Sequence, residues 1–152
     1  TSPVIRKFLE AEARPTVMVL MVQKEVAQRI CSNPPRMNLL AVSVQFYADS
    51  KIAGYVSKKS FWPKPKVDSA IIVISPRTEP AKDVLTEDFF KVAKAGFSQP
   101  RKQLLNNLSK GLQLNKADAT LWLKKNDIEP SQRAETLSID DWIKLTKTYP
   151  HR

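Results

Sequence analysis

Hydrophobic and polar positions along residues 1–77 predict helices and strands in alternation. The spacing of apolar residues predicts a first helix that begins near Ser2, which can act as an N-cap, and runs to about Ala13. The continuous apolar run over residues 16–22 is rich in β-branched residues and predicts a parallel strand that is covered on both faces. A helix over residues 23–31 follows, and two prolines end it.

The next segments predict strands and one element of uncertain type. Residues 39–47 alternate like a strand, but their apolar positions also fit one face of a helix, so periodicity leaves both possibilities open. Residues 52–56 predict a short strand and residues 57–66 a loop that contains prolines. Residues 69–75 predict a strand, because they form an apolar run of strand length.

Beyond this point the pattern predicts only helices. Residues 76–86 carry prolines and mixed charges and are the best linker candidate. Four helices are expected, starting with Thr86 and spanning residues 86–93, 104–108, 117–125 and 139–146. The fold class expected from the pattern is therefore α/β plus all-α, with a domain over residues 1–77 and a helical domain over residues 78–152.

Several apolar or sulfur-containing side chains are expected to pack in the core rather than to act on a ligand. Met18 and Met21 lie in the apolar strand, and Trp122 and Trp142 fall at apolar positions of helices. Cys31 is expected to be a plain buried or half-buried thiol, because no histidine lies near it in sequence.

Composition narrows the possible partners. The 152 residues carry a net charge of +10, which favours a polyanionic partner such as nucleic acid or an anionic membrane surface. Only three glycines are present, at Gly54, Gly96 and Gly111, and a loop that cradles a nucleotide needs clustered glycines. A single cysteine and the near-terminal His151 provide neither a metal site nor a catalytic triad, and no apolar run is long enough to cross a membrane.

Two clusters could bind nucleic acid. Phe61 and Trp62 lie in a proline-stiffened loop with Lys64 and Lys66, where the rings could stack on bases or could plug the end of a small core. Residues 89–116 contain no acidic residue. Their basic residues are Lys91, Lys94, Arg101, Lys102, Lys110 and Lys116, and Asn106 and Asn107 add polar groups. This stretch is either a solvated basic face or a footprint for a nucleic-acid backbone, whereas Glu25, Asp49 and Asp68 are scattered and fit caps or ion pairs.

The segment Phe61-Trp-Pro-Lys-Pro-Lys-Val-Asp-Ser-Ala70 resembles the Phe-x-Pro-x-Pro-x-Val-x-Ser motif of the rRNA adenine dimethyltransferases. Three further segments resemble this family in order and spacing, at residues 22–29, 97–108 and 128–138. The resemblance implies the second half of a Rossmann-like class I methyltransferase domain, followed by a small helical domain that binds rRNA. It also favours a helix over residues 39–47.

The family resemblance further implies a function for the parent protein. That protein would transfer methyl groups from S-adenosylmethionine to two adjacent adenosines near the 3′ end of small-subunit rRNA. In the family, the donor loop and an Asn-Leu-Pro-Tyr tetrapeptide precede the segment that resembles this chain. We therefore expect a carboxy-terminal fragment that is inactive alone and binds no S-adenosylmethionine or metal.

The resemblance also suggests roles for individual residues. Phe61 would stack on the target adenine as the catalytic aromatic residue. The residues expected to bind RNA are Lys58, Lys59, Lys64, Lys66, Lys94, Arg101, Lys102, Asn106 and Lys110. Trp62, at a variable position of the motif, could add a second stacking surface or could merely pack.

The expected partner is small-subunit rRNA or the pre-ribosomal small subunit, in the cytoplasm and without a membrane. Self-association through the unpaired edge of strand 16–22 is also expected to be possible. Two alternatives stay open: a non-enzymatic RNA-binding or ribosome-assembly module, and a protein that binds DNA through a helix-turn-helix.

Overall fold

A computed structural model describes residues 2–11, 13, 15–77 and 83–150. The chain divides into two compact units, one formed by residues 1–32 and 43–80 and the other by residues 33–42 and 81–152. The sequence did not predict that residues 33–42 group with the second unit. A domain boundary between residues 77 and 78 stays a prediction.

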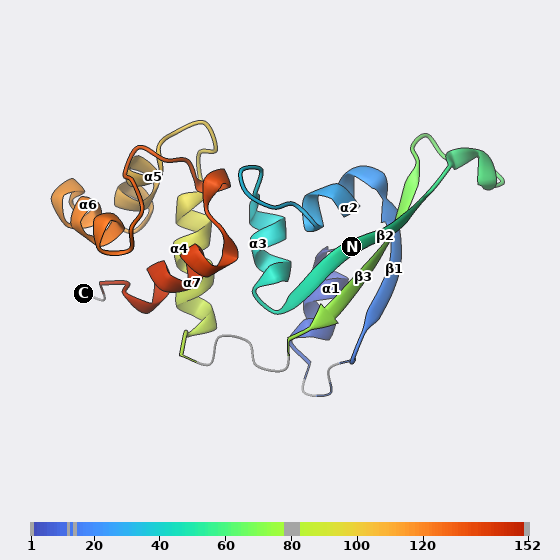
Figure 1. The fold of residues 1–152 in the computed structure, drawn as a ribbon, viewed down its shortest axis with the longest axis horizontal. Helices are drawn as coiled ribbons and strands as arrows, with labels where there is room; N and C mark the ends of the chain where they lie inside the picture. The colour runs from blue at the N-terminus through green and yellow to red at the C-terminus, as the bar shows by residue number, and fades with distance from the viewer. Residues whose placement is uncertain (1, 12, 14, 78–82, 151–152) are drawn as a thin grey trace. The chain divides into compact units, whose positions relative to one another are not determined.

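The first unit is built on a three-stranded sheet with the order β1-β3-β2 (Figure 1). Its strands are β1 (Met18–Gln23), β2 (Ala48–Val56) and β3 (Ser69–Pro76), and β3 pairs antiparallel with both neighbours. The predicted strands are thus confirmed, although β2 begins earlier than residue 52. A bulge between Ile52 and Gly54 shifts its register against β3.

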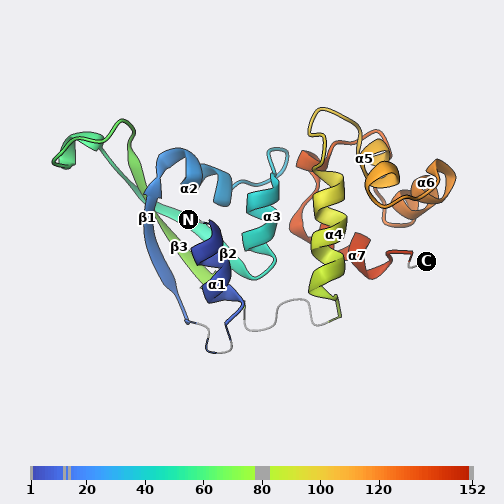
Figure 2. The same ribbon diagram turned by 180° about the vertical axis from the view of Figure 1, so that it is seen from behind.

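The prediction for residues 16–22 is wrong in two respects. β1 pairs antiparallel with β3, and its side chains alternate between the two faces instead of being covered on both. Met18 is buried as expected, but Met21 is 55% exposed and Val19 is 62% exposed. An apolar run signals that a strand can be covered on both faces, yet in the first unit the described helices that precede and follow β1 lie on one face of the sheet (Figures 1 and 2), and alternate residues of β1 stay exposed.

Helices cover one face of the sheet. Alternate residues of β3 are buried. Helix α1 (Ser2–Leu9) ends before Ala13, and its buried residues Ile5 and Leu9 are each 1% exposed. The predicted capping role of the Ser2 side chain lies outside the described residues. Helix α2 (Lys24–Ile30) confirms its prediction and packs against all three strands.

Helix α3 (Leu39–Gln45) settles the ambiguous segment as a helix. Asn38 begins it, because the amide oxygen of Asn38 accepts a hydrogen bond from Ala41 N at 3.0 Å. The side-chain amide of Gln45 donates to the carbonyl oxygen of Ser32 at 2.8 Å and so ties the end of α3 to the segment after α2.

Glu10 links α1 to the segment that precedes β2. Its carboxylate accepts hydrogen bonds from the Arg6 guanidinium at 2.7 Å and from the Tyr47 hydroxyl at 2.8 Å. Partial burial opposes ionisation of Glu10, but the hydrogen bonds from Arg6 and Tyr47, together with the charge of Arg6, outweigh it, and the pKa of Glu10 is lowered.

This lowered pKa predicts a small acid-dependent loss of stability. The interaction of the Glu10 carboxylate with Arg6 and Tyr47 stabilises the fold at pH values above the ordinary carboxyl pKa. This contribution is lost as the pH falls through the lowered pKa of Glu10. We expect Glu10→Gln to reduce the free energy of unfolding at pH 7 by at most about 1 kcal/mol, since solvent screens an exposed pair. In urea unfolding, the free energies of unfolding of the native chain and of Glu10→Gln should become equal at low pH. A difference that is the same at pH 7 and pH 3 would contradict a stabilising role of the ionised Glu10 carboxylate.

The second unit contains α4 (Thr86–Gly96), α5 (Leu104–Gly111), α6 (Lys116–Lys125) and α7 (Ile139–Lys147), which agree with the four predicted helices. Trp142 is fully buried and Trp122 is 5% exposed, which confirms that both pack in the core. Ser138 and Asp141 form a capping box at the start of α7. Much of the predicted linker, and His151, lie outside the described residues.

Candidate nucleic-acid interface

A loop between β2 and β3 projects beyond the sheet and carries one of the two predicted clusters (Figure 1). We call residues 57–68 the tip loop. Short hydrogen bonds hold it: the Ser57 hydroxyl accepts from Lys59 N at 3.2 Å and begins a 3-10 turn, Lys58–Ser60. The carboxylate of Asp68 accepts from Lys58 N at 2.9 Å and closes the loop at its base. Ser57 is the N-cap of this turn, and the Asp68 carboxylate provides a second acceptor for its backbone.

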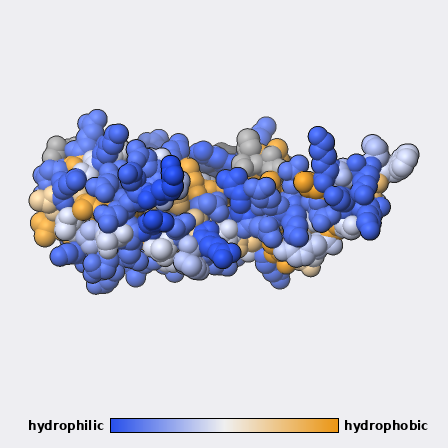
Figure 3. Space-filling model, turned by 90° about the horizontal axis from the view of Figure 1, so that it is seen from above, coloured by the Kyte–Doolittle hydropathy of each residue, from blue (hydrophilic) through white to orange (hydrophobic). Residues whose placement is uncertain are grey.

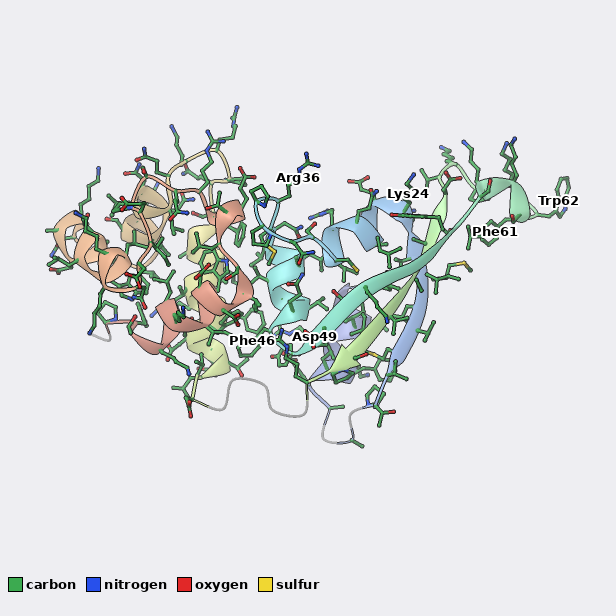
Figure 4. All side chains as sticks on the ribbon, in the orientation of Figure 1. Lys24, Arg36, Phe46, Asp49, Phe61 and Trp62 are labelled. Carbon is green, nitrogen blue, oxygen red and sulfur yellow. The ribbon has the colours of Figure 1, made fainter. Side chains whose placement is uncertain are left out.

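The tip loop presents aromatic and cationic groups to solvent. Trp62 is 97% exposed, so the interpretation that it plugs a small core is wrong. Phe61 is half-buried, which leaves part of its ring accessible. Lys59, Lys64 and Lys66 are exposed, and Lys58 is half-buried with its ammonium donating to the carbonyl oxygen of Lys66 at 3.3 Å. Figure 4 shows Trp62 at the outer end of the loop and Phe61 beneath it.

Lys24 and Tyr55 extend this charged region toward the sheet, and sequence reasoning missed both. The Lys24 ammonium lies over the Tyr55 ring, 5.3 Å from its centroid, while Lys24 N donates to the carbonyl oxygen of Asp68 at 3.0 Å. They could not have been found from the sequence, because only the sheet order brings the start of α2 next to the neck of the tip loop.

The second predicted cluster forms a pocket in the helical unit, where α4 turns into α5. We call it the corner pocket. It has a volume of about 250 Å³ and is lined by Ser98, Gln99, Lys102, Asn106, Asn107 and Lys110. The structure thus brings together Lys102, Asn106 and Lys110. Arg101 lines a neighbouring depression that shares Lys102, and Lys94 is exposed on α4 without lining either cavity.

Buried contacts fix the walls of the corner pocket. Asn107 is only 3% exposed, and its amide nitrogen donates to the carbonyl oxygens of Gly96 at 2.7 Å and of Gln99 at 3.0 Å. It therefore shapes the turn and is a structural residue, which the sequence did not distinguish from its neighbour Asn106. A Cβ at Gly111 would lie 2.7 Å from Ala95 Cβ, so α5 packs closely on α4.

The cations around the corner pocket have no acidic partner among the described residues. Arg101, Lys102 and Lys110 form none of the ion pairs in the described part of the chain, whereas Asp49 pairs with Arg77 at 2.9 Å. Unpaired lysines beside neutral amides suit an anionic ligand that also accepts and donates hydrogen bonds. Seen from above, the surface is mainly hydrophilic, and hydrophobic residues form scattered patches (Figure 3).

The structure also bears on other kinds of chemistry. Within the described ranges, no group of histidine, cysteine or acidic side chains could hold a metal ion. Cys31 is half-buried, and this burial raises the pKa of its thiol although a hydrogen bond with Ser50 opposes the shift. The prediction of a half-buried thiol is confirmed. No helix in the described part of the chain could cross a bilayer.

The glycines do not fit a methyl-donor site. Gly54 lies in a strand, a Cβ at Gly96 would collide with Trp142, and Gly111 faces Ala95. None of them has a positive φ. They serve strand and helix packing, so the described residues contain no glycine-rich loop that could approach the phosphate or sulfonium group of a cofactor.

Comparison with known proteins gives the family of the whole chain. The sequence model of ribosomal RNA adenine dimethylase matches residues 1–150. The chain belongs to this family. Among curated members of the ribosomal RNA adenine dimethylase family, it is 45% identical over 150 residues to "Ribosomal RNA small subunit methyltransferase A" of Dehalococcoides mccartyi, which covers 98% of the chain and 52% of that protein. The protein of the same name from Enterococcus faecalis is 40% identical, over 96% of the chain and 52% of its own length.

Solved structures support the same fold. A dimethyladenosine transferase from Plasmodium falciparum superposes with a TM-score of 0.77 at 23% identity, covering 95% of this chain and 61% of that one. The 23S rRNA methyltransferase ErmE gives a TM-score of 0.72 at 19% identity, covering 97% of this chain and 59% of that one. The fold is thus that of the Rossmann-like dimethylase family, and the chain spans about half the length of its curated relatives.

Proposed function

We propose that this chain is the carboxy-terminal half of an S-adenosylmethionine-dependent rRNA adenine dimethyltransferase. The parent protein would act in the cytoplasm on two adjacent adenosines near the 3′ end of small-subunit rRNA. The chain would comprise the second half of the catalytic domain and a helical rRNA-binding domain. The observation that carries the proposal is the half-exposed Phe61 in the tip loop of a chain that belongs to the dimethylase family.

The contribution of the tip loop would be to hold the target base. An adenine amine is a poor nucleophile, so the base must leave its stack and be positioned accurately. Phe61 offers a ring face, and Pro63 and Pro65 restrict the backbone around it, which lowers the entropy lost on binding. Lys64 and Lys66 are exposed beside it and would contact phosphates.

The corner pocket would contribute affinity for rRNA. Lys102 and Lys110 can each neutralise a phosphate, and Asn106 can hydrogen-bond to sugar or base. Arg101, in the adjoining depression, would add another backbone contact. Because the described glycines do not fit a donor site, the methyl donor would be bound by residues outside this chain, and the chain alone would be inactive.

The test is methylation by the complete protein that contains this chain. Incubated with S-adenosylmethionine and a small-subunit precursor, it should form dimethyladenosine at two adjacent positions, detected by mass spectrometry of nuclease digests. In parallel, calorimetry of this chain alone should show no heat of binding with S-adenosylmethionine. An unmodified precursor would refute the enzymatic proposal, and a clear heat of binding would refute the location of the donor site.

A second candidate is a non-enzymatic RNA-binding or ribosome-assembly module, which the cations and amides of the corner pocket favour. This module would bind the same rRNA without modifying it. Salt-dependent binding of the precursor by the complete protein, with no methyladenosine formed, would select it over the enzyme.

Under either function, the corner-pocket lysines should set the salt dependence of rRNA binding. We expect Lys102→Ala and Lys110→Ala each to lower the slope of log affinity against log salt by about 1, because each removes one phosphate contact. Lys124→Ala, which removes an exposed lysine on α6 that lines neither cavity, is the matched control. Equal slopes for the pocket variants and the control would exclude the pocket as a phosphate site.

A further inference from the structure

Trp62 is the most exposed of the large hydrophobic side chains described in the chain. It is 97% exposed, whereas the other two tryptophans, Trp122 and Trp142, are 5% and 0% exposed. No ring or cation contact joins Trp62 to any described residue. Leaving so large an aromatic surface in water is unfavourable, so an exposed tryptophan of this kind marks a binding surface.

The backbone of the tip loop separates Trp62 from Phe61. Phe61 has an extended conformation, with φ −117° and ψ 147°, and successive side chains of an extended segment point to opposite sides. Figure 4 shows Trp62 extending from the outer end of the loop and Phe61 beneath it. The two rings therefore cannot stack on the same face of one base. If Phe61 holds one base, Trp62 is placed to contact a different group of the ligand.

The positive charges in the tip loop around Trp62 favour an anionic ligand. Four lysines share the tip loop with it, at Lys58, Lys59, Lys64 and Lys66, and the only acidic residue of the loop is Asp68. The Asp68 carboxylate is engaged by Lys58 N at the base of the loop, away from Trp62 at the outer end. An aromatic plane next to unpaired cations is the arrangement that binds single-stranded nucleic acid.

From these observations we infer that Trp62 is a second base-stacking site, which binds an unpaired nucleotide of the RNA other than the one held by Phe61. This inference rests on the proposed RNA substrate and adds a contact to it. Pro63 restricts the backbone of Trp62, so stacking costs little conformational entropy. The site would recognise unpaired rather than duplex RNA, since a paired base has no free face.

Tryptophan emission provides a direct test in this chain, because Trp62 is 97% exposed, whereas Trp122 and Trp142 are only 5% and 0% exposed. Single-stranded RNA should quench the emission strongly, and a duplex of equal length should quench it much less. In anisotropy titrations with labelled single-stranded RNA, Trp62→Ala and Trp62→Leu should weaken binding about 5- to 150-fold, the range expected for one stacked base. Trp62→Phe, which keeps a ring, should stay within about 3-fold of the native chain.

Matched controls separate this inference from its alternatives. Leu121→Ala removes another large exposed side chain, 68% exposed, and should leave RNA affinity unchanged. Equal quenching by duplex and single strand, or unchanged affinity of Trp62→Ala, would overturn the inference. So would a blue shift with phosphatidylserine vesicles but no response to RNA, because tryptophan and lysine together also suit an anionic membrane surface.

The outcome is independent of the methylation test. If the complete protein forms dimethyladenosine but Trp62→Ala binds RNA normally, only the second stacking site fails. If Trp62-dependent RNA binding is seen and no dimethyladenosine forms, the stacking site stands and the proposed enzymatic function fails.

Discussion

Replacing Phe61 by alanine in the complete protein should reduce kcat/KM for rRNA methylation about 5- to 150-fold, since a stacked base loses about 1–3 kcal/mol with its aromatic partner. Phe61 is half-buried, and alanine removes its ring while the hydrogen bonds of Ser57 and Asp68 still hold the tip loop. Steady-state methylation of a small-subunit precursor measures the effect.

Two further variants show whether the ring itself is responsible. Phe61→Tyr keeps an aromatic face and should retain kcat/KM within about 5-fold, well above the alanine variant. Leu85→Ala removes a side chain that is 71% exposed and lies outside both clusters, so it should behave as the native protein. Equal rates for Phe61→Ala and Leu85→Ala would show that Phe61 has no role in the reaction.

Gly96→Ala should destabilise the helical unit by about 1–3 kcal/mol, the usual cost of overpacking a core. A Cβ at this position would collide with the ring of Trp142 and lie 3.2 Å from Leu104 Cδ1. Trp142 is fully buried and cannot move aside without disturbing its neighbours. Because the Gly96 carbonyl accepts the hydrogen bond from Asn107, the corner pocket should be distorted as well.

Gly54→Ala is the matched control for this substitution. An added Cβ at Gly54 meets no atom within 4 Å, so stability should change by less than about 0.5 kcal/mol. Thermal unfolding followed by tryptophan emission measures both variants. A Gly96→Ala protein that unfolds at the same temperature as Gly54→Ala would contradict the described packing of α7 on α4.

Much of the fold was predictable because the decisive signals are local. The pattern over residues 139–146 predicts α7, and the prolines after residue 32 end α2 as expected. Residues 39–47 could not be assigned from periodicity, since a buried helix and a buried strand both read as apolar there. The resemblance to the family, and then the structure, decided for a helix.

The errors concern contacts that are distant in sequence. An apolar run such as 16–22 does not reveal whether its partner strand is parallel, and β1 pairs with β3 some fifty residues later in the chain. Met21 was assigned to the core because it lies in that run, yet it is exposed within the described residues. Sequence can identify an apolar strand, but not which of its faces the rest of the protein covers.

The sequence predicted which residues belong to the candidate site, but it did not predict which of them lie together. The sequence pointed to Lys102, Asn106 and Lys110, but only the turn held by Asn107 shows that they line one pocket. Trp62 could have packed or been exposed, and nothing local distinguishes the two. Its 97% exposure is seen only in the folded structure, where Trp62 lies at the outer end of the tip loop.

Photocrosslinking from the target base tests most directly whether the tip loop holds it. With 2-azidoadenosine in place of one target adenosine, the complete protein should crosslink in the tryptic peptide that spans residues 60–66, since trypsin does not cut between Lys64 and Pro65. Fragment spectra should assign the crosslink to Phe61, and crosslinks that fall only on other peptides would contradict the account.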